Sequence, residues 1–502
     1  MSKISKRIKQ FTQTAIEQNL IGEADRYYTQ NRLLALLERD ELSHETLSEK
    51  ELPTLLESLD ALRQFAQAEG LLGKLSYEIE QFEALVMDLV TPAPSVLNQR
   101  FWSYYEESPA KATTYFYQLS KKNDYIKTRQ IAKNVAFKSP SAYGELDITI
   151  NLSKPEKDPK EIALAKNAPA SNYPACLLCM QNEGYQGRNN HPARANHRLV
   201  RMDLGGENYG MQYSPYVYYN EHSIFLSDQH RPMAVDRACF EHLLDIVTVL
   251  PHYFAGSNAD LPIVGGSILA HDHYQGGAYE FAMDKASALE SFTSAHFDEV
   301  SIELLKWPMS VLRLRSLNRQ QLADFAEFIH TSWMNYSDES VDILSHTAGE
   351  RHNTITPIAR RRGEHYEMDL VLRNNRTTEA YPDGLFHPHA DVQHIKKENI
   401  GLIEVMGLAI LPPRLLKELD DIKAYLLDKT SLDTVAQGHQ QWAKEMKEAH
   451  KTFNADQLDP FIEGEVGAKF SRVLEDAGVF KQTPSGLAAF KKFIDQVIKT
   501  TV

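Results

Sequence analysis

Gly265-Gly266-Ser267-Ile268-Leu269-Ala270-His271-Asp272-His273-Tyr274-Gln275-Gly276-Gly277 is the stretch that carries the most information about this chain. In an extended segment, alternate residues point to the same side, so His271, His273 and Gln275 are expected to share one face. The glycine pairs at both ends permit close approach of the backbone to a ligand. Free N–H groups of residues 265–267 suit phosphate oxygens. The stretch therefore predicts a strand that handles a phosphorylated ligand.

The chemistry of this stretch favours group transfer. A neutral imidazole can attack phosphorus and divide one difficult transfer into two easier steps. Gln275 can donate a hydrogen bond to a phosphoryl oxygen but cannot deliver a proton, so it gives water no acid catalyst. The alternative is that His271 and His273 are ordinary polar residues on a half-exposed strand, and the glycines and the glutamine weigh against it.

Outward from this stretch, the chain predicts a mixed α+β protein. Apolar residues at helical spacing (Leu52, Leu55, Leu59, Leu62, Phe65) occur in a region up to residue 138 that has only three glycines. Alternation of Leu146, Ile148, Ile150 and Leu152 with polar residues predicts a half-buried strand. Residues 216–226 and 368–373 also look extended. Helices are expected after Pro232 and from Leu415 onward.

Composition excludes several classes of protein. The 502 residues include 68 acidic and 54 basic side chains, a net charge of −14, which argues against a general nucleic-acid binder. No apolar run approaches the roughly 18 residues of a membrane helix. The N-terminus is polar and basic, unlike a secretory signal. Three cysteines do not make a disulfide scaffold, and the cytoplasm is the expected location.

Cys176 and Cys179 form a C-x-x-C pair, which can share one tetrahedral metal ion if two more ligands come from elsewhere. Cys239 is a poor candidate, because it falls on the helix predicted after Pro232 and is expected to lie in a core. Two alternatives stay open. One is a redox pair, although the thioredoxin-like βαβ unit that usually carries it is not evident. The other is a pair of free buried cysteines.

The histidine stretch resembles the active-site strand of the histidine-triad superfamily, in the branch where glutamine replaces the third histidine. The wider sequence is similar to the hexose-1-phosphate uridylyltransferases, in particular the longer bacterial class of galactose-1-phosphate uridylyltransferases. Three further segments carry this resemblance: CLLCMQNEGYQGRNNHPARANHR (176–198), YSPYVYYNEHSIFLSDQH (213–230) and QHIKKENIGLIEVMG (393–407). The shorter class has proline and glycine where this chain has Asp272 and Tyr274.

The resemblance implies two tandem histidine-triad-like halves made of antiparallel sheets, with helical additions at both ends. We expect a helical region at 1–138, a first half with nucleophile and metal site at 139–285, a second half on the hexose-phosphate side at 286–420, and a helical region at 421–502. The implied reaction moves uridylyl from UDP-glucose to galactose-1-phosphate, giving glucose-1-phosphate and UDP-galactose. His273 would be the nucleophile and Gln275 would hold the phosphoryl oxygen. A homodimer is implied as well.

The resemblance also implies a structural zinc ion, with His230 and His271 completing the ligand set of Cys176 and Cys179. A second metal near His387 and His389 is a further possibility. The implied contacts to nucleotide and sugar phosphate are Asn220, Glu221, Gly266, Ser267, Lys397 and Glu404. Other basic residues are candidates for phosphate contact: Lys154, Lys157, Lys160, Arg188, Arg194, Arg198, Arg360, Arg361 and Arg362. A solvated surface is the favoured alternative for the three lysines and for the triple arginine.

Two other functions fit the same residues. The first is a dinucleoside polyphosphate phosphorylase or hydrolase of the same superfamily, which shares the histidine strand. The second is a non-catalytic, zinc-stabilised protein that binds nucleotide sugars. Neither the accepted hexose phosphate nor the role of the terminal regions follows from the sequence.

Overall fold

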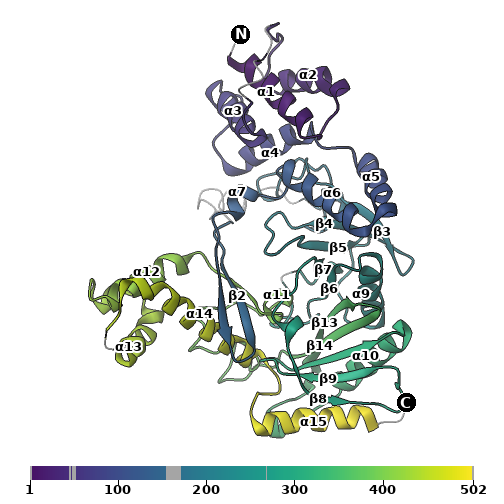
Figure 1. Ribbon diagram of the computed structural model, residues 1–502, viewed down its shortest axis with the longest axis vertical. Coiled ribbons are helices and arrows are strands. Elements are labelled where there is room, and N and C mark those ends of the chain that lie inside the picture. Colours follow the sequence, from purple (N-terminus) through teal and green to yellow (C-terminus); the bar gives the residue numbers. More distant parts are fainter. Residues whose placement is uncertain are drawn as a thin grey trace. The chain divides into compact units, whose positions relative to one another are not determined.

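The computed structural model describes residues 3–44, 47, 52–153, 171–266, 268–450 and 452–499. The chain folds as two compact units (Figure 1). Unit 1 contains Met1–Gln130 and Lys154–Arg231, and unit 2 contains Ile131–Ser153 and Pro232–Val502. Each unit is therefore assembled from two separate stretches of sequence.

Helices make up the first part of unit 1. The capping of α3 shows why a helix begins there: the Thr54 hydroxyl accepts the N–H of Glu57 at 3.2 Å, and the Glu57 carboxylate accepts the N–H of Thr54 at 2.7 Å. Buried Leu55, Leu59 and Leu62 form the inner face of α3. The helices are α1 (Lys3–Glu17), η1 (Glu23–Asp25), α2 (Arg26–Leu36), α3 (Leu55–Ala68), α4 (Ser76–Asp88), α5 (Pro94–Glu107), α6 (Pro109–Lys122) and the short α7 (Thr128–Ile131).

Three antiparallel strands complete unit 1: β3 (Val200–Leu204), β4 (Glu207–Tyr213) and β5 (Ser223–Ser227). A short helix, η2 (Met180–Asn182), follows the cysteine pair. The prediction of an extended run over 216–226 is wrong in its first part, because a turn precedes β5. Glu221 lies in that turn with φ at 56°, a left-handed conformation that a strand does not use.

An antiparallel array of strands forms the centre of unit 2, in the spatial order β7-β6-β13-β14-β10-β9-β8. Helices α9 and α10 pack on the same face of it (Figure 1). The strands are β6 (Phe254–Gly256), β7 (His273–Gly277), β8 (Ala288–Phe292), β9 (Ser301–Leu305), β10 (Val311–Ser316), β13 (Asn353–Arg362) and β14 (His365–Asn374). The helices are α9 (Arg237–Val249) and α10 (Arg319–Met334).

A smaller sheet in unit 2 has the order β1-β2-β15. Strands β1 (Val135–Ser141) and β2 (Gly144–Ile150) form an antiparallel hairpin, whereas β15 (Leu408–Leu411) pairs with β2 in parallel. Helix α14 packs against β1. The remaining elements of unit 2 are η3 (Met283–Lys285), η4 (Glu339–Val341), β11 (His346–Thr347), β12 (Glu350–Arg351), α11 (Leu402–Val405), α12 (Arg414–Leu426), η5 (Leu432–Thr434), η6 (Gln437–His439), α13 (Gln440–Ala449), α14 (Ala455–Ala477) and α15 (Pro484–Lys499).

The α+β class, with antiparallel sheets and helical segments at both ends, is confirmed. The predicted strand at 146–152 is β2, although it ends at Ile150, and the helix expected after Pro232 is α9, begun by Asp236, whose carboxylate accepts the N–H of Cys239 at 3.0 Å. Cys239 is buried in that helix as expected. The four-part division at 138, 285 and 420 stays a prediction. Among the described residues, no helix is both long enough and apolar enough to cross a membrane.

Candidate functional site

The histidine strand is β7, which begins at His273 and pairs with β6 so that Gln275 faces Gly256. His271 lies in a bend just before the strand rather than in it, and its side chain is fully buried. The Nδ1 atom of His273 lies 2.7 Å from the backbone oxygen of His271. Since a carbonyl oxygen only accepts, Nδ1 donates, and the lone pair of the neutral ring is on Nε2. Burial lowers the pKa of His273, which favours that neutral ring.

The reverse face of β7 is anchored to α9. Tyr274 is 2% exposed, and its hydroxyl lies 3.0 Å from Nδ1 of His242. Tyr274 therefore points away from the face of His273 and Gln275, because neighbouring strand residues alternate. Tyr274 consequently does not occupy the face of the strand that carries His273 and Gln275.

The glycine pair before the strand approaches other parts of the chain closely. A Cβ atom on Gly265 would lie 2.4 Å from the backbone oxygen of Ala259, and one on Gly266 would lie 2.7 Å from Nδ2 of Asn258. The two glycines were expected to let the backbone approach a ligand closely. In the structure they lie, at least in part, against other residues of this chain. Ser267 lies outside the described residues, as do Lys154, Lys157 and Lys160.

Asn258 is a residue that the sequence did not single out. Its side chain is 5% exposed, its Oδ1 accepts the N–H of Leu402 at 2.9 Å, and its amide nitrogen lies beside Gly266. Asn258 therefore joins the loop before the histidine strand to the start of α11, which carries Glu404. The sequence gives little indication that Asn258 has this role, since Gly256-Ser257-Asn258 has the composition of an ordinary turn.

Glu404, one of the predicted substrate contacts, is buried and forms an ion pair with Lys396. The Lys396 Nζ atom lies 2.9 Å from Oε1 of Glu404, while Lys397 is exposed. Burial opposes the charge of Lys396, yet the Glu404 carboxylate outweighs that penalty and raises the pKa of the lysine. The other Glu404 oxygen accepts the N–H of Gly401 at 3.2 Å. The carboxylate is thereby fixed at the first turn of α11.

The cysteine pair in unit 1 is arranged as metal ligands would be. The two Sγ atoms lie 3.5 Å apart, and Nδ1 of His230 lies 3.2 Å from Sγ of Cys179. Two sulfurs on one tetrahedral zinc ion at about 2.3 Å would be about 3.8 Å apart. Among the described residues, the group of histidine, cysteine and carboxylate side chains that could hold a metal ion is Cys176, Cys179, His230 and His271.

The surroundings of the pair do not resemble a redox site. Cys179 ends a turn that leads into the single turn of η2, with no long helix beginning at the cysteines. Burial raises the pKa of the Cys179 thiol to about 11, and the adjacent Cys176 adds to the shift. Sulfur with imidazole nitrogen is a donor set that zinc prefers. The residues present therefore fit a structural zinc ion.

Other predicted residues have different surroundings. Asn220 is exposed and Glu221 buried, both in the turn before β5. His387 and His389 do not belong to any group of three potential metal ligands among the described residues. The favoured interpretation of Arg360 as solvated is wrong, since this arginine is 4% exposed and contacts Glu367 at 2.6 Å and Asp369 at 2.7 Å. Arg360 lies in the buried part of β13, whereas Arg361 and Arg362 lie at the accessible end of the strand.

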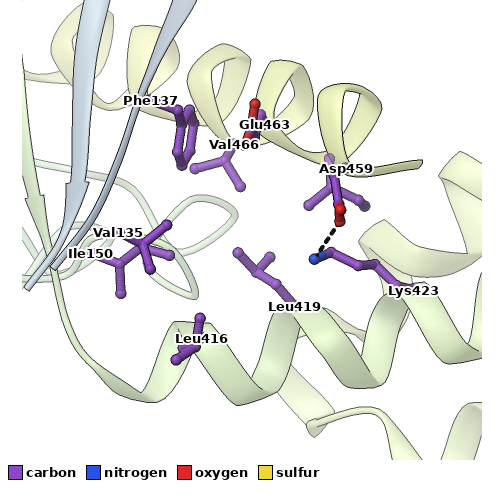
Figure 2. Close-up of a pocket in the computed structure, with 10 residues that line it drawn as sticks. Val135, Phe137, Ile150, Leu416, Leu419, Lys423, Asp459, Glu463 and Val466 are labelled. Carbon is purple, nitrogen blue, oxygen red and sulfur yellow. Dashed lines mark ion pairs between the residues drawn. The ribbon is translucent and has the colours of Figure 1, made fainter. Parts of the chain in front are cut away.

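A cavity of about 210 Å³ lies elsewhere in unit 2 (Figure 2). Its walls come from β1, β2, α12 and α14, and its lining is mostly apolar. An ion pair of 2.7 Å between Lys423 and Asp459 lies along one side. The lining of the cavity includes none of the predicted site residues, so the cavity is not the candidate site.

Comparison with known proteins gives consistent matches. The family model for the N-terminal domain of galactose-1-phosphate uridyl transferase matches residues 19–232, and that for the C-terminal domain matches 247–445. A galactose-1-phosphate uridylyltransferase of Streptococcus pneumoniae (strain Hungary19A-6) is 53% identical over 98% of both chains. One from Streptococcus mutans is 51% identical over 97% of this chain and 98% of its own. Among solved structures, yeast Ap4A phosphorylase has a TM-score of 0.35 at 14% identity, over 67% of this chain and 93% of its own.

These matches place the chain in the class of nucleotidyltransferases. Both domain models together cover most of the sequence, and the curated relatives align along almost its full length. The chain belongs to the galactose-1-phosphate uridylyltransferase family.

Proposed function

We propose that this protein transfers uridylyl between UDP-glucose and galactose-1-phosphate by double displacement through a uridylyl-histidine intermediate on His273. The observation that carries the proposal is the 2.7 Å contact between Nδ1 of His273 and the backbone oxygen of His271. It supports a ring whose Nε2 lone pair is available for attack on phosphorus. The activity named for the relatives supports the choice of substrates.

In the first half-reaction, Nε2 of His273 attacks the α-phosphorus of UDP-glucose. The bond from that phosphorus to the bridging oxygen breaks, and glucose-1-phosphate leaves with the electron pair. In the second half-reaction, a phosphate oxygen of galactose-1-phosphate attacks the same phosphorus, the P–N bond breaks, and UDP-galactose leaves. His273 recovers its lone pair, so no proton is consumed over the cycle.

Gln275 is proposed to donate a hydrogen bond to a nonbridging oxygen of the transferred group. It lies two residues after His273 on the same strand, so both side chains share one face. We also propose that the side-chain amide of Asn258 and the backbone at Gly266 contact the phosphates together, since the amide and this backbone are neighbours. Asn220, Glu221, Ser267, Lys397 and Glu404 remain proposed substrate contacts, and for Glu404 the proposal includes its bound partner Lys396.

We propose zinc as the metal, held by Cys176, Cys179, His230 and His271. Its role is structural: it would fix the side chain of His271, whose backbone oxygen orients His273. The protein is further proposed to act in the cytoplasm as a homodimer, which light scattering on the purified protein tests. A second metal at His387 and His389 is not part of this proposal, because His389 already contacts Asp476 and the backbone of Leu385.

Mass spectrometry after incubation with UDP-glucose alone tests the proposed intermediate. The expected result is one added UMP on the peptide that contains His273. His273→Ala is expected to abolish both this adduct and the exchange of label between UDP-glucose and glucose-1-phosphate. The exposed His296 offers a matched control, and His296→Ala should retain both. Normal turnover by folded His273→Ala would refute the assignment.

The two alternative functions are disfavoured by the family match. A dinucleoside polyphosphate phosphorylase would release labelled nucleotide from a labelled dinucleoside polyphosphate. It would not exchange label between UDP-glucose and glucose-1-phosphate. A protein that only binds nucleotide sugars would form no adduct. The same two measurements therefore separate all three functions.

A further inference from the structure

Asn182 lies three residues after Cys179, and it is 1% exposed. Its amide nitrogen donates to the backbone oxygens of both Cys176 and Cys179, each at 2.8 Å. The two N–H groups of one side chain thus link the first and last residues of the C-x-x-C turn. This contact fixes the backbone of the turn independently of the thiols.

The oxygen of the same amide is also engaged. Oδ1 of Asn182 lies 2.6 Å from Nε2 of His191, whose ring is 7% exposed. Because the amide nitrogen donates to two carbonyls, Oδ1 is the acceptor and Nε2 of His191 is the donor. Both N–H groups and the oxygen of the Asn182 amide therefore have partners.

His191 is itself held in place by a small hairpin. The backbones of Arg188 and His191 exchange two hydrogen bonds of 2.9 Å, and the ring packs edge-on against Tyr185 at 5.5 Å between centroids. Burial, with a smaller contribution from Arg188 and Arg194, lowers the pKa of His191 to about 4. The ring is consequently neutral and stays a single-tautomer donor to Asn182.

The turn that this arrangement holds already has the shape that a metal needs. The Sγ atoms are 3.5 Å apart, and the N–H of Leu178 points to Sγ of Cys176 at 3.3 Å. A site organised before the metal arrives loses less conformational freedom on binding, so its affinity is higher. Partners in the outer layer of metal sites typically account for 10–100-fold in affinity.

We propose that Asn182, oriented by His191, is a positioning residue that pre-forms the C-x-x-C turn for metal binding. This inference rests on the proposed metal centre. Neither residue is a ligand: Asn182 acts through the backbone of both cysteines, and His191 acts through Asn182. The predicted consequence is a loss of metal affinity with the ligand set unchanged.

The test is a Zn²⁺ titration of the full-length protein against a chromophoric chelator. Asn182→Ala is expected to weaken Zn²⁺ binding by about 10–100-fold relative to wild type. Asn190→Ala is the matched control, because the exposed Asn190 lies next to His191 and its Oδ1 accepts a hydrogen bond from Nε of the half-buried Arg188 rather than from the cysteine turn. Its Zn²⁺ affinity should equal that of wild type. Co²⁺ loaded into Asn182→Ala should still show the charge-transfer bands of thiolate ligands.

A second measurement separates positioning from general destabilisation. A residue with only a structural role would lower Tm equally with and without Zn²⁺. A positioning residue lowers affinity, so the rise in Tm caused by a fixed Zn²⁺ concentration should be smaller in Asn182→Ala than in wild type. If that variant does not fold, His191→Phe carries the test, since it keeps the ring packing on Tyr185 and removes the donor.

Three outcomes would overturn the inference. If both variants bind Zn²⁺ with wild-type affinity, the positioning role is contradicted and the metal centre is not. An unchanged Zn²⁺-induced rise in Tm does the same. Absence of Zn²⁺ binding by wild type contradicts the metal centre and the inference together. Label exchange between UDP-glucose and glucose-1-phosphate, measured on the same samples, reports separately on the proposed function.

Discussion

The carbonyl oxygen of His271 decides which nitrogen of His273 carries the proton. A histidine with two free nitrogens would divide its population between tautomers, and only one would present a lone pair to phosphorus. The 2.7 Å contact removes that ambiguity within a stretch of three residues. At this scale the proposed chemistry depends on the backbone geometry of residues 271–273.

Gln275→Ala is expected to reduce kcat by about 100-fold with little change in folding, because one donor to the developing phosphoryl charge is lost. Steady-state kinetics with UDP-glucose and galactose-1-phosphate measures the effect. The variant should still form some uridylyl adduct, since His273 remains. A kcat within twofold of wild type would exclude the proposed role of this amide.

A second residue-scale prediction concerns pH. His394 is half-buried; its Nδ1 lies 2.7 Å from Nδ1 of His439, which in turn contacts Glu418 at 2.9 Å. Burial, followed by His439, Lys469 and Arg414, lowers the pKa of His394 to about 4. The unfolded chain, with a histidine pKa of about 6.5, therefore binds more protons between these values.

The free energy of unfolding should consequently fall as pH drops from about 6.5 towards 4, and His394→Gln should flatten that dependence. Urea unfolding at pH about 7 and about 5 measures both slopes. Equal loss of stability in the two proteins would assign the acid sensitivity to other groups.

At the scale of elements, α14 shows how one helix combines two kinds of glycine. A Cβ on Gly464 would meet open space, whereas a Cβ on Gly467 would lie 1.9 Å from Oγ of Ser139 in β1. The first glycine only weakens the helix, while the second allows it to pack on the sheet. The two positions belong to the same helix, so they form a matched pair.

Gly464→Ala is expected to stabilise the protein by about 0.5–1 kcal/mol, through helix propensity. Gly467→Ala should destabilise it by about 1–3 kcal/mol, because the sheet and the helix must move apart. Thermal unfolding of both variants checks the opposite signs. Shifts of Tm in the same direction would contradict this description of the interface.

Hydrophobic periodicity in the sequence predicted those helices and strands that have one buried face. The alternation in β2 and the apolar stripe of α9 each follow from the requirement that a half-buried element hides one face. Partners across long sequence distances could not be predicted. Nothing local distinguishes Lys396 from Lys397, and the contact between Asn258 and Leu402 spans 144 residues.

At the scale of the whole molecule, the proposed zinc ion predicts a response to chelation. Prolonged treatment with a strong chelator should remove about one metal ion per chain and lower Tm, and added Zn²⁺ should restore it. Metal analysis and calorimetry on the same samples measure both. A preparation with no stoichiometric metal and an unchanged Tm would exclude the centre, while leaving the nucleophile assignment intact.

The parallel pairing of β15 with β2 has a consequence for synthesis on the ribosome. Ile150 finds its neighbour Leu411 only after the intervening chain has been made. At about 5–20 residues per second, the roughly 260 residues between the two strands take on the order of 10–50 s to emerge. Throughout that interval the edge of β2 that later pairs with β15 has no partner, so the nascent hairpin is open to pairing with other strands.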